Sequence, residues 1–81
     1  MSVVEKKEVN NTIHLSSSIG QAEPYVWFWY DIPNTYYHVS GYGETATEAK
    51  FRFIEGEKRL KKFFEEKGIE DYLENTVFEF D

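Results

Sequence analysis

Cysteine is absent from this chain of 81 residues, which excludes disulfide bonds, thiolate zinc ligands and a cysteine nucleophile. Proline occurs twice and glycine five times, and no linker rich in either residue divides the sequence. Lysine and arginine number 9 against 15 acidic residues, and the formal net charge of −6 works against binding a phosphate backbone. We therefore expect one acidic domain over residues 1–81, with residues 1–7 flexible.

Long apolar segments are also missing. No apolar run approaches the roughly 20 residues that a membrane-spanning helix needs. Residues 1–8 alternate charge with valine, unlike a signal peptide. The sequence therefore predicts a soluble, cytoplasmic protein with no membrane partner.

Aromatic side chains are abundant by contrast, and Phe, Tyr and Trp make up 19% of the residues. A chain of this length can build only a marginally sufficient core. Each buried aromatic side chain removes roughly 150–250 Å² from water. We expect these side chains to compensate for the small core.

Three strands are predicted in the first half of the chain. Residues 8–16 alternate apolar and polar side chains with a period of two, which favours a first strand. A polar loop follows over residues 16–24. Residues 25–32 are almost entirely aromatic or apolar and indicate a central strand, and residues 36–42 form the third strand. The short turn at Pro33 makes the last two an antiparallel hairpin.

A long helix and a last strand follow. Thr45 and Glu48 stand three residues apart, the spacing of a capping box that satisfies main-chain donors at a helix start. We predict a helix over residues 46–67, about 33 Å long, with a left-handed cap at Gly68 and a short strand over residues 76–80. The order is β-β-β-α-β, an α+β fold in which one long helix packs on one face of an antiparallel sheet.

A sheet with one helix has one covered face and one open face. We place the more aliphatic set of strand residues under the helix: Val26, Phe28, Tyr30, Ile32, Ile13, Leu15, Tyr37 and Val39. The open face then carries Trp27 and Trp29, beside Tyr36, His38, His14 and Thr12. The reverse assignment stays open.

An uncovered aromatic patch of this size on a monomer is typical of an interface. Two other interpretations remain: the N-terminal segment or the loop over residues 16–24 covers the patch, or cross-strand aromatic pairs merely stiffen the sheet. On the helix, Phe51 points almost opposite the apolar stripe and Ile54 lies off it. The candidate interaction surface is therefore Trp27, Trp29, Tyr36, His38, Phe51 and Ile54.

Residue patterns typical of catalysis are missing. A zinc site at His14 and His38 would need carboxylates from elsewhere, so two half-exposed polar residues are the simpler interpretation. No nucleophile elbow or phosphate-binding loop occurs. We expect no enzyme activity, no cofactor and no metal. The aromatic face is also not expected to stack nucleic-acid bases, because the lysines and arginines crowd the helix on the other side.

The segment over residues 25–64 resembles the HicB-like antitoxin domain, a small β-β-β-α-β unit related in outline to double-stranded-RNA-binding domains. The resemblance rests on the aromatic second strand, the Asp-Ile-Pro turn at residues 31–33, and Gly-x-Gly-Glu-Thr-Ala-x-Glu-Ala at residues 41–49. Phe-Glu-Phe at residues 78–80 is similar to the last strand of short orphan members of the Bacteroidales type. Full antitoxins add a DNA-binding motif, for which we expect no room after Asp81.

The resemblance implies a non-enzymatic interaction domain that forms a homodimer or binds a small protein partner. The alternative is an acidic inhibitor or decoy, for example of phage origin, that competes for the site of a nucleic-acid-binding protein.

Overall fold

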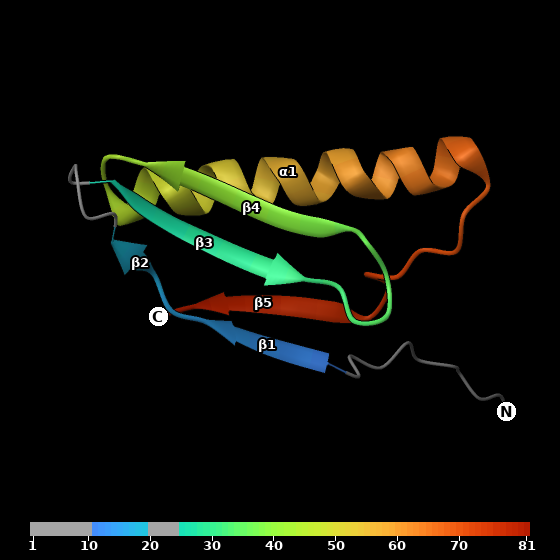
Figure 1. The fold of residues 1–81 in the computed structure, drawn as a ribbon, viewed down its shortest axis with the longest axis horizontal. Helices are drawn as coiled ribbons and strands as arrows, with labels where there is room; N and C mark the ends of the chain where they lie inside the picture. Colours follow the sequence, from blue (N-terminus) through green and yellow to red (C-terminus); the bar gives the residue numbers. More distant parts are fainter. Residues whose placement is uncertain (1–10, 20–24) are drawn as a thin grey trace, which may run out of the picture.

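A computed structural model describes residues 11–19 and 25–81 of the chain (Figure 1). The elements are β1 (Asn11–Leu15), β2 (Ser18–Ile19), β3 (Val26–Asp31), β4 (His38–Gly43), α1 (Ala46–Lys67) and β5 (Thr76–Phe80). The predicted α+β class, with one helix on a small sheet, is confirmed. The two-residue strand β2 lies inside the predicted loop. The expectations for residues 1–10 and 20–24 lie outside the described residues.

The strands form two hydrogen-bonded groups. The antiparallel hairpin of β3 and β4 is as predicted, and β2 pairs antiparallel with the other edge of β3. The pairing of β1 with β5 is parallel, so the prediction of a wholly antiparallel sheet is wrong for this pair. The reason is that α1 carries the chain back along the length of the sheet, and a helical crossover allows the next strand to run parallel to an earlier one.

Local signals place both ends of α1 where the sequence predicts them. The Thr45 hydroxyl accepts from the main-chain N–H of Glu48 at 3.1 Å. The carboxylate of Glu48 accepts from the N–H of Glu44 at 3.0 Å, one residue before the donor that a capping box would use. At the other end Gly68 has φ +69°, and its N–H donates to carbonyls of the last turn. Capping chemistry therefore fixes α1 at both ends.

Two glycines allow α1 to approach β4 closely. A Cβ at Gly41 would stand 2.1 Å from the main-chain nitrogen of Phe53 and 2.7 Å from the carbonyl oxygen of Ala49. A Cβ at Gly56 would stand 3.2 Å from the carbonyl oxygen of Ser40. The helix therefore rests on the backbone of β4 and leaves no room for a side chain at Gly41.

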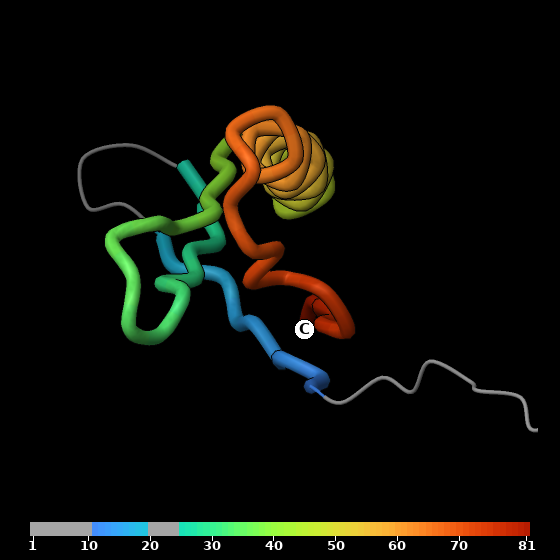
Figure 2. The backbone as a smooth tube through the Cα atoms, turned by 90° about the vertical axis from the view of Figure 1, so that its right-hand side faces the viewer, coloured from blue at the N-terminus to red at the C-terminus, as the bar shows by residue number. Residues whose placement is uncertain are grey.

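The core lies between α1 and the sheet. Its buried apolar residues are Leu15, Phe28, Ile32, Val39, Ala49, Phe53, Phe64 and Leu73. Viewed along the long axis, α1 and β5 lie on the same side of β3 and β4 (Figure 2). Phe78 and Phe80 of β5 contact Phe53 edge to face, with ring centroids 5.0 and 5.4 Å apart. The predicted assignment of the aliphatic set to the helix side is therefore confirmed.

Candidate protein-interaction surface

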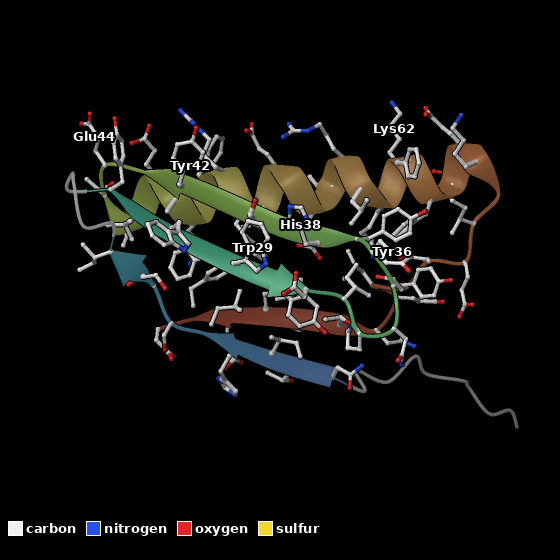
Figure 3. All side chains as sticks on the ribbon, in the orientation of Figure 1. Trp29, Tyr36, His38, Tyr42, Glu44 and Lys62 are labelled. Carbon is white, nitrogen blue, oxygen red and sulfur yellow. The ribbon has the colours of Figure 1, made fainter. Side chains whose placement is uncertain are left out.

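Five aromatic and imidazole side chains lie on the face of the β3–β4 hairpin opposite α1. We call this set, Tyr25, Trp27, Trp29, His38 and Tyr42, the outer aromatic face. Strand alternation produces it: Phe28 and Val39 turn inward and are buried, so their neighbours along each strand turn outward. Figure 3 shows Trp29 and His38 side by side on the hairpin, Tyr36 at its turn and Lys62 away from them on α1.

Cross-strand contacts fix the geometry of this face. The ring of Trp29 stacks on His38 with centroids 4.2 Å apart and planes 9° apart. The Trp29 indole Nε1–H donates to the Asp31 carboxylate at 2.8 Å. Trp27 stands opposite Tyr42 in the strand register, and Tyr42 meets Tyr25 edge to face at 6.2 Å. These contacts hold the aromatic side chains in fixed positions on the sheet.

Despite these contacts the face is open to solvent. The exposed fractions are 36% for Trp27, 49% for Trp29 and 60% for Tyr42. A hollow of about 370 Å³ is lined by Trp27, Trp29, Ser40, Gly41 and Tyr42. The outer aromatic face therefore combines a concave, mostly apolar centre with large rigid side chains, the composition found at the centres of protein interfaces.

Charge is distributed unevenly between the two sides of the molecule. Within the described ranges every lysine and arginine belongs to α1. The strands of the outer aromatic face contribute Asp31 and His38 as their ionisable groups besides tyrosine. Arg59 reaches a groove at the free edge of β4 that His38 also lines. Among the residues that the structure describes, the strands that carry the tryptophans therefore hold no lysine or arginine, whereas cations usually frame base-stacking sheets.

The six residues predicted as an interaction surface do not form one surface. Trp27, Trp29 and His38 come together on the outer aromatic face. Tyr36 is fully exposed at the hairpin turn. Phe51, 59% exposed, and the half-buried Ile54 lie on α1, which covers the opposite face of the sheet.

Tyr25 and Tyr42 complete the face, and the predicted surface omits both. The signal for Tyr42 was available, because it continues the outward period of two from His38 through Ser40. The turn register then places it opposite Trp27. Tyr25 precedes β3 and faces outward with Trp27 by the same alternation.

The two histidines contact different partners. His14 lies 3.3 Å from the carboxylate of Glu79 across the β1–β5 pair, whereas His38 stacks on Trp29. Among the described residues no group of three or more His, Cys, Asp or Glu side chains gathers in a way that suits a metal ion.

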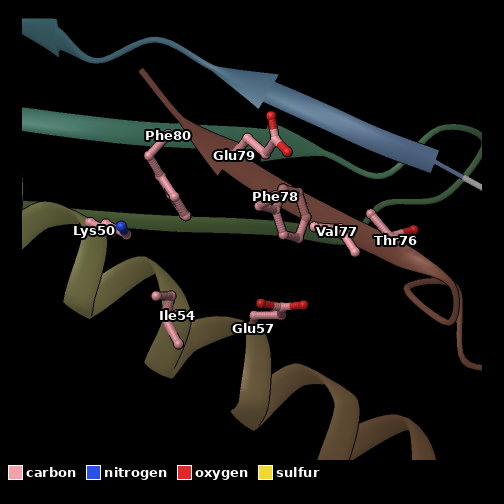
Figure 4. A pocket seen from close by; sticks show the side chains of 8 residues that line it. All are labelled: Lys50, Ile54, Glu57, Thr76, Val77, Phe78, Glu79 and Phe80. Carbon is pink, nitrogen blue, oxygen red and sulfur yellow. The ribbon is translucent and has the colours of Figure 1, made fainter. Parts of the chain in front are cut away.

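A second concave surface lies between α1 and β5, and we call it the α1–β5 groove. Its volume is about 660 Å³, and its lining residues are Lys50, Ile54, Glu57, Thr76, Val77, Phe78, Glu79 and Phe80. In Figure 4, Lys50, Ile54 and Glu57 project from α1 toward β5. Burial raises the pKa of Glu57 above its usual range, and nearby Asp71 adds to this while Lys61 and Lys58 oppose it.

Comparison of the chain with protein-family models, with curated proteins and with solved structures found no match. Among the described residues no helix combines the length and the apolar character needed to cross a bilayer.

Proposed function

We propose that this protein is a small, non-enzymatic, HicB-like interaction domain that binds a small basic protein through the outer aromatic face. The observation that supports this proposal is that α1 covers one face of the hairpin while Trp27, Trp29 and Tyr42 remain open to solvent on the other. Aromatic side chains held rigidly around a hollow are the usual anchors of protein interfaces.

The charge of the protein supports a basic partner. The outer aromatic face itself carries little charge, but the whole chain has a formal net charge of −6. Such a field attracts a positively charged protein over long range, and the aromatic centre then supplies short-range contacts. The resemblance of residues 25–64 to the HicB-like domain agrees with this choice, because antitoxins of that family bind small RNA-cleaving toxins.

The net negative charge of the chain also favours a second candidate function. A protein of this charge can act as an inhibitor that occupies the cationic site of a nucleic-acid-binding protein. The two candidates differ in a measurable way. If this protein is such an inhibitor, adding it would release nucleic acid from the target protein in proportion to the fraction of target bound. If it binds its partner away from the nucleic-acid site, the partner would keep its nucleic acid.

Photo-crosslinking tests where the partner binds. Tyr42 is replaced by p-benzoylphenylalanine in cells that naturally produce the protein, and Phe51 is replaced in the same way as a control on the opposite side of the molecule. We expect one small basic protein to be captured at position 42 and not at position 51. Capture at neither position, or equal capture at both, would contradict the proposal.

Affinity measurements with the captured partner give the quantitative form of the test. We expect Trp29→Ser to weaken binding about tenfold or more, because it removes a central aromatic anchor. Phe51→Ser removes an aromatic side chain of similar exposure from α1 and is expected to leave the affinity unchanged. Calorimetric titration of the purified proteins measures both effects.

A further inference from the structure

The free edge of β5 is the second feature of the molecule that lacks a covering element among the described residues. Parallel strands bond through alternate residues. The N–H of Asn11 donates to the carbonyl of Asn75 at 3.1 Å, and the N–H of Asp81 donates to the carbonyl of Leu15 at 2.9 Å. These two bonds fix the phase of the ladder, so the odd-numbered residues of β5 bond to β1.

The even-numbered residues of β5 therefore direct their main-chain groups away from β1. The N–H and C=O groups of Phe78 and Phe80 point to the edge that the α1–β5 groove follows. In the described part of the chain no strand pairs with this edge. The strand sequence Thr-Val-Phe-Glu-Phe has high β-propensity and contains no proline or lysine, the residues that usually protect an edge from pairing.

We propose that a second copy of this chain pairs with the free edge of β5, so that two β5 strands run antiparallel about a two-fold axis at Phe78. In this arrangement Phe78 faces Phe78 of the second copy, and the two residues exchange main-chain hydrogen bonds. Pairing about a two-fold axis occupies the free β5 edge of each copy, so no β5 edge remains for a third copy and the assembly closes as a dimer.

The side chains of the α1–β5 groove fit a second copy because they are self-complementary. Phe53 packs on Phe78, with ring centroids 5.0 Å apart, which places this part of α1 near the proposed axis. Lys50 precedes Phe53 by three residues and Glu57 follows it by four, and both line the groove. A two-fold axis near Phe78 therefore brings Lys50 of one copy toward Glu57 of the other, and each interface contains this pair twice.

The exposed apolar residues around the groove agree with this arrangement. Ile54 lies within the groove between Lys50 and Glu57. Val77 on β5, which also lines the groove, is 41% exposed. A second copy along β5 would shield these side chains, which the fold of one chain leaves open. This dimer uses none of the residues of the outer aromatic face. The dimer proposal and the proposed binding of a basic partner can therefore fail independently.

Reversal of the two charges tests the proposal. Sedimentation equilibrium measures the dimer Kd of the natural protein and of the Lys50→Glu and Glu57→Lys variants. Each single variant places like charges together at both pairs, and we expect each to weaken the dimer about tenfold. Lys62→Glu, which makes the same charge change outside the groove, is the matched control and is expected to leave Kd unchanged.

Mixing the two single variants gives the decisive result. In a mixed dimer, the glutamate introduced at position 50 of one variant faces the lysine introduced at position 57 of the other, and the remaining natural pair is intact. We therefore expect the equimolar mixture to form mixed dimers with close to the natural Kd, a rescue that no effect inside one chain can produce. Circular dichroism and melting curves confirm that each variant is folded.

Three outcomes would overturn the proposal. The first is a natural protein that stays monomeric at high micromolar concentration. The second is a dimer that the charge reversals leave unchanged, or that Trp29→Ser disrupts, because the interface would then be elsewhere. The third is the failure of the mixed variants to associate. The free edge of β5 would then be a binding site for a strand of a different protein and not for a second copy.

Discussion

At the scale of single residues, Glu57 links the charge of the molecule to its stability. Burial in the α1–β5 groove raises its pKa above the usual value of 4.5, so the folded protein favours the protonated form. Tighter proton binding by Glu57 in the folded state contributes to the free energy of unfolding. This contribution is complete below pH 4.5 and is lost as the pH rises through the folded-state pKa. At neutral pH the ionised carboxylate is therefore less favourable in the fold than a neutral group.

We expect Glu57→Gln to raise the free energy of unfolding at pH 7 by up to about 0.5 kcal/mol. The gain should disappear below pH 4.5, where Glu57 is protonated in both states. Urea unfolding at several pH values, at protein concentrations low enough to keep the chain monomeric, measures the difference. Glu55→Gln, at an exposed position of the same helix, is the control. A gain that persists at low pH would show that burial of the charge is not its cause.

At the scale of elements, the contact between α1 and β4 determines which face of the sheet is covered. Gly41 has no space for a Cβ, because the helix backbone occupies that position. This close approach lets Phe53 reach past β4 toward Phe78 and Phe80 on β5. With α1 on that side, no helix among residues 11–19 and 25–81 covers the outer aromatic face.

We expect Gly41→Ala to destabilise the fold by about 3 kcal/mol or more, because the new Cβ would overlap backbone atoms of α1 that cannot move independently. Gly56→Ala is the matched control on the facing element, since its Cβ would meet the carbonyl oxygen of Ser40 at 3.2 Å. There the better helix propensity of alanine, up to about 1 kcal/mol, offsets the tight contact. Chemical denaturation measures both, and equal losses at the two positions would contradict the role given to Gly41.

The same elements show how far the sequence predicts the structure. The predicted bounds of α1 match because Thr45 and Gly68 are local signals that act within one turn of the helix. The parallel pairing of β1 with β5 escapes prediction, because residues some 65 positions apart select each other through contacts such as that of His14 with Glu79. Strand alternation predicts the outward orientation of Trp27 and Trp29 correctly, and the predicted position of the helix on the other face already separates Phe51 from them.

At the scale of the whole molecule, two separate surfaces are proposed for two different interactions. The outer aromatic face is proposed for a basic protein partner, and the free edge of β5 is proposed for a second copy of the chain. The two lie on different sides of the sheet, so a dimer through β5 would present two outer aromatic faces outward. Such a dimer would bind a multivalent partner more tightly than one copy does.

Tryptophan fluorescence tests the central claim, an outer aromatic face open to solvent, because both tryptophans of the chain lie on that face. We predict a red-shifted emission maximum and efficient quenching by acrylamide, both independent of protein concentration, since pairing through β5 leaves Trp27 and Trp29 exposed. Guanidine-unfolded protein gives the upper limit for quenching. A blue-shifted emission maximum with weak quenching in the native protein would show that the face is covered, and would contradict the account.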